Sequence, residues 1–318
     1  MGRGAVLALS GGVGGAKLCL GLAGVLPAGQ LHVLANTGDD FDHLGLRICP
    51  DIDTLLYTLS GRSSRARGWG LEGETWQVMA ALDQLGGETW FRLGDRDLAT
   101  HLWRTQQLAL GRSLTDVIAE LAGRLGVDAA VYPMSDTPVR TTVQTVQGPL
   151  PFQRYFVEQQ CAPAVESFSF EGIGAASLPA AASALLASTA LETIVICPSN
   201  PYVSIDPILA VPGCWTALRD HRAPVVLVSP IVAGAALKGP AAKMMAELGL
   251  AVSAVAVARH YSERYPGLLD HFVIDRSDAK LATEIEAMGM QVTVTQTVMS
   301  SLADKQRLAG NCLALENS

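Results

Sequence analysis

The sequence has no closely spaced pair of cysteines, no long apolar run and no excess of basic residues. Its six cysteines are scattered without Cys-x-x-Cys spacing, so no zinc site is legible, and the pattern suits buried, reduced thiols in a cytosol. No apolar run reaches the roughly 18 residues of a membrane span. Lys and Arg total 23 against 30 for Asp and Glu, and the net charge of −7 argues against a general nucleic-acid surface, while leaving room for local basic pockets.

The amino terminus and the overall composition indicate the class of protein. Met1 leads almost directly into an apolar strand, which leaves no room for a signal peptide, so we expect a cytoplasmic protein with no membrane partner. The 318 residues are 49% hydrophobic and 6% aromatic, which describes a soluble globular chain of one large domain or two.

Five aspartates crowd the segment from Asn36 to Thr54; they are Asp39, Asp40, Asp42, Asp51 and Asp53. The segment follows an apolar run at 31–35 that predicts a buried strand, so its first aspartates stand where ligands usually bind in open α/β sheets. A short helix over 50–59 would carry Asp53 in its first turn, facing back towards Asp39. Clustered carboxylates repel each other unless a positive charge lies between them, so the segment predicts a divalent-metal site. The alternative is two aspartate-rich turns with a helix cap.

A glycine-rich segment lies between an expected strand at 5–9 and an expected helix at 16–26. Its candidate ligand-binding residues are Gly11, Gly12, Gly14, Gly15 and Lys17. Strand, glycine loop and helix in succession bring bare backbone N–H groups up to a phosphate, and only glycine permits so close an approach. The segment lacks both the third glycine of a dinucleotide fingerprint and the Gly-Lys-Ser/Thr of a P-loop. The alternative is a tight turn that packs the helix closely on the strand.

Residues 61–126 separate two parts of an expected α/β core, 1–60 and 127–318. A polar, basic, glycine-rich stretch at 61–70 predicts a mobile loop whose arginines could close over phosphates. Three helical patterns then follow without intervening strands, which indicates a small helical insert; they cover 75–85, 97–110 and 113–125, with Asp97 and Ser113 as expected N-caps. His101, one turn into the second helix, either touches the ligand or is an ordinary surface or core histidine.

After residue 126, strands and helices alternate again, which predicts an α/β fold with a mostly parallel sheet and helices on both faces. The expected strands cover 129–132, 141–146, 165–170, 193–197, 224–229, 271–274 and 291–295, with a further candidate at 152–157 and helices at 179–190 and 277–288. Prolines fix the backbone around Ser199 and Asn200, whose polar side chains suit a base, ribose or phosphate; a plain turn is the alternative. A second glycine-rich segment, at 234–238, ends in Lys238.

Four of these segments would lie at the carboxyl ends of parallel strands and so line one crevice. They are 11–17, 36–53, 199–200 and 234–238. Glycine backbone on one side offers phosphate contacts, and carboxylates on the other require Mg²⁺ to tolerate a phosphate beside them. This combination predicts phosphoryl transfer.

Seven short motifs follow one another along nearly the whole chain. They stand at 11–17 (Gly-Gly-Val-Gly-Gly-Ala-Lys), 36–40 (Asn-Thr-Gly-Asp-Asp), 50–54 (Pro-Asp-Ile-Asp-Thr), 67–70 (Arg-Gly-Trp-Gly), 93–101, 198–201 (Pro-Ser-Asn-Pro) and 229–232. In this order they resemble the 2-phospho-L-lactate transferase family of coenzyme F-420 biosynthesis. The resemblance implies a Rossmann-like core with a small helical insert, and a homodimer. It also implies Mg²⁺-dependent transfer of a phospholactyl, phosphoenolpyruvyl or phosphoglyceryl group from a guanosine diphosphate ester to the ribityl hydroxyl of the deazaflavin Fo, with release of GMP.

The same resemblance implies roles for individual residues. Asp39 and Asp53 match the metal-binding aspartates, and Asp40 lies where the incoming hydroxyl or a metal-bound water could be held. The segment at 11–17 would contact phosphates, and Ser199 and Asn200 match the guanosine side. Trp69 is the candidate for stacking on the deazaflavin, with plain packing as the alternative. The remaining candidate ligand contacts are Asn36, Arg67, His101 and Lys238.

Two other classes of protein share parts of this pattern. Nucleotide-sugar-binding regulators of gluconeogenesis and cell shape belong to the same superfamily and bind without turnover, but their aspartate-rich segment is built differently. An NAD dehydrogenase is disfavoured because Lys17 stands in place of the third fingerprint glycine. Retention of both aspartate motifs together with the motif at 67–70 favours the enzyme.

Overall fold

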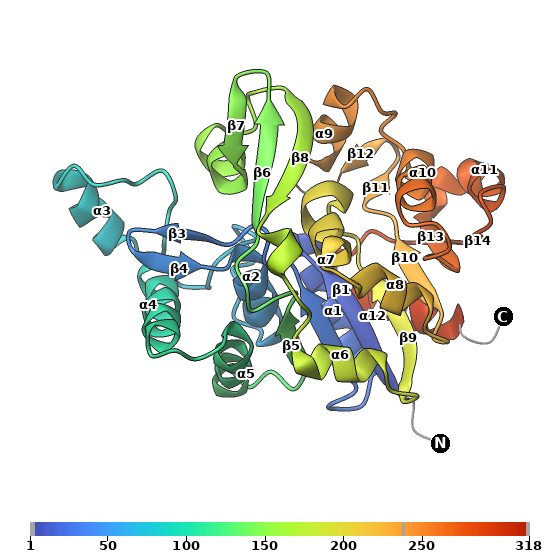
Figure 1. Cartoon of the computed structure of the whole chain (residues 1–318), viewed down its shortest axis with the longest axis horizontal. Helices are drawn as coiled ribbons and strands as arrows, with labels where there is room; N and C mark the ends of the chain where they lie inside the picture. Colours follow the sequence, from blue (N-terminus) through green and yellow to red (C-terminus); the bar gives the residue numbers. More distant parts are fainter. Residues whose placement is uncertain (1–3, 237–238, 316–318) are drawn as a thin grey trace.

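The computed structural model describes residues 4–236 and 239–315, and its centre is a single seven-stranded sheet (Figure 1). The strand order is β14-β13-β10-β9-β1-β2-β5, and every neighbouring pair is parallel. The strands are β1 (Ala5–Ser10), β2 (Leu31–Ala35), β5 (Ala130–Pro133), β9 (Leu191–Ile196), β10 (Val225–Val228), β13 (His271–Asp275) and β14 (Gln291–Thr295). The predicted Rossmann-like α/β fold is confirmed.

Helices cover both faces of this sheet, as the alternation of side chains in β1 requires. Val6 and Ala8 join one buried cluster, whereas Leu7 and Leu9 join the cluster on the opposite face. The first face is covered by α1 (Gly12–Val25), α2 (Pro50–Leu59), α5 (Leu114–Leu125) and α12 (Leu302–Ala314). The second is covered by α6 (Ala180–Leu186), α7 (Asp206–Ala210), α8 (Cys214–Arg219), α9 (Ala241–Glu247), α10 (Ala254–Arg264) and α11 (Ala282–Glu286).

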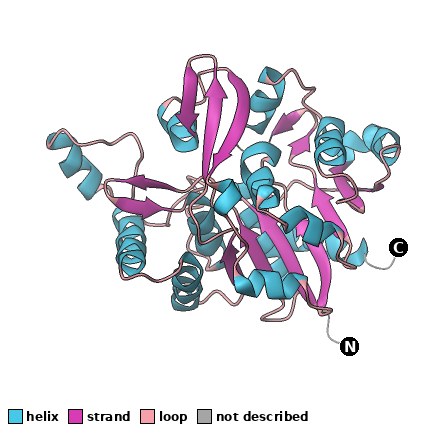
Figure 2. Ribbon diagram, viewed as in Figure 1, coloured by secondary structure: helices cyan, strands magenta, loops and turns pink. Residues whose placement is uncertain are grey.

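An antiparallel hairpin, β3 (Phe41–His43) with β4 (Leu46–Ile48), interrupts the aspartate-rich segment and was not expected from the sequence. Its turn residues, Leu44 and Gly45, both have positive φ, as a tight two-residue hairpin requires. The hairpin projects from the sheet together with α3 (Gln77–Gln84) and α4 (Asp95–Ala109), and α4 lies against β4 (Figure 2). The three helices expected at 75–125 are therefore present, while the domain boundaries remain a prediction.

Two expected strands of the main sheet belong to a different sheet. β6 (Arg140–Thr145) pairs antiparallel with β7 (Gly148–Pro151) and with β8 (Val165–Glu171). The tight turn between β6 and β7 leaves no room for the crossover that a parallel pair needs. The candidate strand at 152–157 is mostly a π-helical turn, η1 (Arg154–Glu158), and the helix expected at 277–288 is divided into the 3₁₀ turn η4 (Arg276–Leu281) and α11. The remaining elements are η2 (Ile173–Ala175), η3 (Pro201–Ile205), β11 (Ile231–Val232) and β12 (Ala235–Ala236).

Helix starts were predicted with mixed success. The helix at 50–59 is confirmed, and Ser113 caps α5 by accepting from the Asp116 backbone N–H at 3.1 Å. α1 begins at Gly12 rather than Ala16, so most of the expected glycine loop is its first turn. Asp97 is not the cap of α4, whose N-cap is Gly94. Within 4–236 and 239–315, no helix has the length and apolar character needed to span a bilayer.

Candidate functional site

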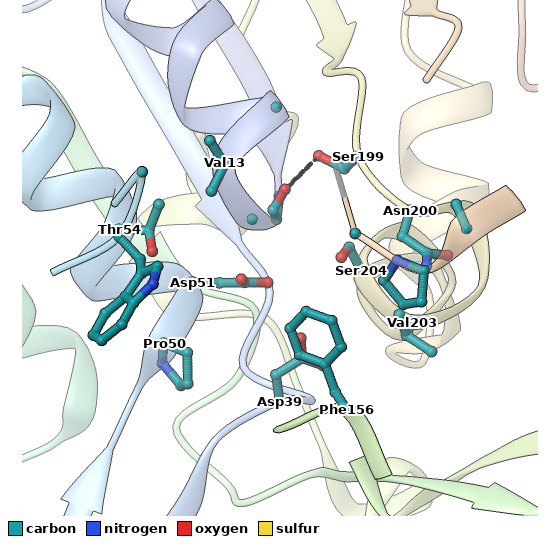
Figure 3. A pocket seen from close by; sticks show the side chains of 18 of the residues that line it. Val13, Asp39, Pro50, Asp51, Thr54, Phe156, Ser199, Asn200, Val203 and Ser204 are labelled. Carbon is teal, nitrogen blue, oxygen red and sulfur yellow. Dashed lines mark hydrogen bonds between the residues drawn. The ribbon is translucent and has the colours of Figure 1, made fainter. Parts of the chain in front are cut away.

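A cavity of about 740 Å³ opens at the carboxyl ends of β1, β2, β9 and β10, where the crevice was predicted. The predicted site residues that line it are Gly11, Gly12, Gly14, Lys17, Asp39, Asp53, Arg67, Trp69, His101, Ser199 and Asn200. Gly15, Asn36 and Asp40 are buried and are not among its lining residues, and Lys238 lies outside the described residues. Thr54 and Pro50 stand on one side and Ser199, Asn200 and Ser204 on the other, with Asp51 between them (Figure 3).

Two buried carboxylates, Asp39 and Asp51, destabilise each other's ionised form in this cavity. Burial, and then the charge of Asp51, raise the pKa of Asp39 well above its usual range. Burial also raises the pKa of Asp51 to about 6, against the effect of hydrogen bonds from Asn36 and the Gly12 backbone. The Oδ1 atom of Asp39 is buried without a hydrogen-bond partner in the described chain. Because uncompensated buried carboxylates are costly, this arrangement suits a cation.

Asn36 positions Asp51 rather than lining the cavity. Its Nδ2 donates to Asp51 Oδ2 at 3.0 Å and to the Val203 carbonyl at 3.2 Å, and its Oδ1 accepts from the Gly38 N–H at 2.8 Å. Both N–H groups of this amide donate to the protein, and the role of Asn36 as a ligand contact remains a prediction.

Asp53 forms a buried ion pair with Arg104, a residue on α4 that is 0% exposed. The guanidinium Nη1 and Nη2 donate to Asp53 Oδ1 and Oδ2 at 2.7 and 2.8 Å. Arg104 Nη2 also lies 2.7 Å from His101 Nδ1. Each Asp53 oxygen keeps a second lone pair, so the pairing leaves this carboxylate able to bind a cation from the cavity side.

Asp40 lies behind the cavity wall. Burial raises its pKa to about 7, while a hydrogen bond with the Cys49 thiol and the charge of Arg140 act in the opposite direction. Its role in holding the incoming hydroxyl remains a prediction.

The glycines at the start of α1 serve two purposes. A Cβ at Gly14 would lie 2.2 Å from the Pro198 carbonyl oxygen, and one at Gly15 would lie 2.4 Å from Ser10 Oγ. These two glycines therefore allow close docking of the helix, which is the packing alternative considered above. Gly12 has φ of +64°, and its N–H donates to Asp51 at the helix N-terminus. A phosphate bound there would lie beside a carboxylate, which again requires a cation between them.

The side chains of Ser199 and Asn200 form hydrogen bonds to backbone groups just after the end of β9. Ser199 Oγ donates to the Gly11 carbonyl at 2.7 Å and accepts from the Gly11 N–H at 3.1 Å, so it fixes the turn before α1 (Figure 3). Asn200 Oδ1 caps η3 by accepting from the Tyr202 N–H at 3.0 Å. Both line the cavity, and their contact with guanosine remains a prediction.

The segment at 61–72 is an internally hydrogen-bonded loop. The Ser64 N–H donates to the Gly70 carbonyl at 2.9 Å, and the Glu72 N–H donates to the Arg62 carbonyl at 2.8 Å. The Arg67 guanidinium lies against the Trp69 and Trp76 rings, 5.6 and 5.2 Å from their centroids, and donates to the Leu71 carbonyl. Trp69 is 42% exposed and faces the cavity, so a flat ring remains accessible to a ligand.

A second group of side chains that could hold a metal ion lies between α2 and α4. Ligand atoms of Asp53, Asp97 and His101 lie within 4.8 Å of one another. Arg104 already supplies a positive charge to this group, so the Asp39 and Asp51 side of the cavity fits a divalent ion better. Hard carboxylate oxygens in either place suit Mg²⁺.

The roles of Asp51 and Arg104 at the site were not anticipated, nor was the grouping of His101 with Asp97. Asp51 was counted in the aspartate-rich segment but not assigned a role. Asp97, His101 and Arg104 lie on one face of α4, and the spacing of three to four residues could have revealed this. The pairing of Arg104 with Asp53 spans 51 residues, and no local pattern reports it.

The fold and the site together define an α/β protein with a carboxylate-lined cavity at the carboxyl ends of parallel strands. Residues 6–307 match the model of the family described as 2-phospho-L-lactate transferase CofD, and the chain belongs to this family of transferases.

Named relatives extend over nearly the whole chain. It is 40% identical over 316 residues to the phosphoenolpyruvate transferase of Kitasatospora aureofaciens, covering 98% of this chain and 97% of the relative. It is 39% identical over 304 residues to the 2-phospho-L-lactate transferase of Methanosarcina acetivorans, covering 96% of each. The fold resembles that of a UPF0052 family member from Bacillus halodurans, with a TM-score of 0.65, 14% identity, and coverage of 98% of this chain and 99% of that one.

Proposed function

We propose that this transferase moves a phospholactyl, phosphoenolpyruvyl or phosphoglyceryl group from a guanosine diphosphate ester to the terminal ribityl hydroxyl of the deazaflavin Fo, releasing GMP. The observation that carries the proposal is the pair of buried carboxylates, Asp39 and Asp51, beside the N-terminus of α1. A diphosphate and a divalent cation together would satisfy both groups. The names of the two relatives agree with this substrate class.

The chain's residues divide the work of this reaction. Asp39 and Asp51 would hold Mg²⁺, while Asp53, the metal ligand that the sequence predicted beside Asp39, pairs with Arg104 and would offer its remaining lone pairs from the other side of α2. When bound, Mg²⁺ neutralises the diphosphate so that an oxygen nucleophile can approach phosphorus. The first turn of α1 and Lys17 bind phosphate oxygens, while Ser199 keeps that turn in place. The hydroxyl oxygen of Fo bonds to the phosphorus that bears the three-carbon acid, the bond to the GMP oxygen breaks, and the hydroxyl proton leaves to a carboxylate.

Aromatic side chains from several segments provide a surface for the deazaflavin in the cavity. Trp69, Trp90, Phe91 and Phe156 all line it. Flat rings of this kind bind an extended heterocycle by stacking. We place the deazaflavin against them, with Trp69 as its stacking partner, and the guanosine near Ser199 and Asn200. We further propose that the protein acts in the cytoplasm as a homodimer.

A mass-spectrometric assay tests the proposal. Fo, GTP and Mg²⁺ are offered with each phosphorylated three-carbon acid and its partner guanylyltransferase, and both the Fo adduct and GMP are quantified. The proposal predicts equal amounts of the two products with at least one acid. Tight retention of a nucleotide sugar without turnover would instead identify a binding regulator of the same superfamily.

A further inference from the structure

His101 is a fully buried side chain in the wall of the cavity, and its two ring nitrogens have different surroundings. The residue is 1% exposed and lines the cavity one turn into α4. Nδ1 lies 2.7 Å from Arg104 Nη2. Within the described chain Nε2 has no hydrogen-bond partner, although Asp97 Oδ1 lies 3.3 Å away.

The guanidinium of Arg104 determines which ring nitrogen carries the proton. A guanidinium has N–H groups and no acceptor, and it stays protonated in proteins. The nitrogen facing it must therefore offer a lone pair, so Nδ1 is the acceptor. The proton of the neutral ring then resides on Nε2.

Neighbouring groups hold Arg104 in this position. Both of its terminal nitrogens are anchored on Asp53, and its Nε donates to the Arg47 carbonyl at 3.2 Å. Rotation of the guanidinium away from His101 would break its bonds to the buried carboxylate of Asp53, which is costly. Arg104 is thus a positioning residue that fixes the tautomer of His101.

The Nε2–H group lacks a well-placed acceptor. Asp97 Oδ1 lies 3.3 Å from Nε2 without forming a hydrogen bond to it, and the same oxygen accepts from the Tyr57 hydroxyl at 2.6 Å. A buried N–H without a partner costs free energy, and that cost is removed when a ligand oxygen supplies the acceptor.

We propose that His101 binds the substrate as a hydrogen-bond donor through Nε2, with Arg104 fixing its tautomer, and that it does not accept the proton of the attacking hydroxyl. The ligand atom is an oxygen acceptor of the group bound beside Asp53. The substrate identity rests on the proposed function, but the tautomer does not, because it concerns the free protein.

The first test is nitrogen-15 NMR of the imidazoles in the free wild-type protein, with the His101 signals assigned by their absence in His101→Gln. The expected result is a pyrrole-like Nε2 and a pyridine-like Nδ1. A pyrrole-like Nδ1, or two protonated nitrogens, would overturn the proposal even if the protein transferred no phosphoryl group.

Three substitutions then separate a donor from a base by kcat/KM. Gln keeps both features, since its amide oxygen can accept from Arg104 while its NH₂ donates to the ligand. Glu supplies only acceptors when ionised, and Phe supplies neither group. The kcat/KM of His101→Gln is expected to stay within about threefold of the wild-type value, whereas the kcat/KM of His101→Phe and of His101→Glu should fall roughly tenfold to a hundredfold.

The opposite order would contradict the proposal. Retained activity in His101→Glu with loss in His101→Gln would identify a base, and unchanged activity in His101→Phe would remove any ligand contact. His32→Gln is the matched control, because His32 bonds Tyr132 away from the cavity, and its kcat/KM should not change. Thermal melts of all variants show whether a loss reflects unfolding.

Discussion

Arg104 and Asp53 form a two-point ion pair at 2.7 and 2.8 Å with the arginine wholly buried, and this pair joins the projecting α4 to α2, the helix that carries Asp51 and Asp53. Removing one partner of such a pair leaves an uncompensated buried charge. Arg104→Met should therefore lower the free energy of unfolding by about 3–5 kcal/mol, measured by urea denaturation. A change below about 1 kcal/mol would show that the pair contributes little to holding α4 in place.

Alanine substitution of two helical glycines, one in α1 and one in α5, should change the stability of the protein in opposite directions. Gly14→Ala places a methyl group 2.2 Å from a backbone oxygen and should cost about 1–3 kcal/mol of stability, with loss of activity. Gly123→Ala in α5 is the control, since a Cβ there meets nothing within 4 Å. It should raise stability by roughly 0.5–1 kcal/mol because alanine loses less backbone entropy on folding. Equal effects in thermal melts would contradict the packing argument.

Metal binding should depend on pH in the direction set by the cavity carboxylates. Burial raises the pKa of Asp51 to about 6, and burial together with the charge of Asp51 raises the pKa of Asp39 well above its usual range. Below about pH 6 Asp51 holds a proton, and the raised pKa of Asp39 acts in the same direction; these protons must leave before Mg²⁺ binds. The calorimetric affinity for Mg²⁺ should therefore rise from about pH 5 to about pH 7, and Asp51→Asn should flatten part of this rise. An affinity that falls or stays level over this interval would argue against a metal at these residues.

Two residues of the loop at 61–72, Arg67 and Trp69, should affect different kinetic constants. If Arg67 meets the diphosphate in the reacting complex, Arg67→Ala should lower kcat more than it raises the KM for Fo. Trp69→Ala should do the reverse, because stacking stabilises ground and transition states alike; loss of ~1 kcal/mol would raise KM roughly fivefold. A loop that only connects elements would instead give a lower melting temperature with kinetics preserved.

The fold class, the crevice at the strand ends and the local helix signals were predictable, whereas individual long-range side-chain pairs were not. The sequence was sufficient for α2, from its proline start to Leu59, and for the cap at Ser113, since both depend on neighbouring residues. The β3–β4 hairpin was missed because Leu44-Gly45 is not one of the usual dipeptides of a tight hairpin turn.

The same distinction holds within the site. Asp51 and Asp53 are two residues apart, so a helix directs them roughly 200° apart around its axis. Asp51 meets Asn36 and the start of α1, whereas Asp53 meets Arg104. Only the tertiary arrangement of α1 and α4 around α2 could assign these partners.

The most direct test of the account compares aspartates from the same segment in the Fo transfer assay. Asp39→Asn and Asp51→Asn each remove a buried cavity carboxylate, whereas Asp42→Asn alters an exposed side chain on β3 that pairs with Arg47. If metal-dependent phosphoryl transfer occurs in this cavity, folded Asp39→Asn and Asp51→Asn should each lose at least about a hundredfold in the rate at which GMP and the Fo adduct form at saturating Mg²⁺. A loss of this order is expected when charge stabilisation at phosphorus is removed. Asp42→Asn should keep wild-type turnover. Wild-type turnover in folded Asp39→Asn and Asp51→Asn would contradict the assignment of the chemistry to this cavity.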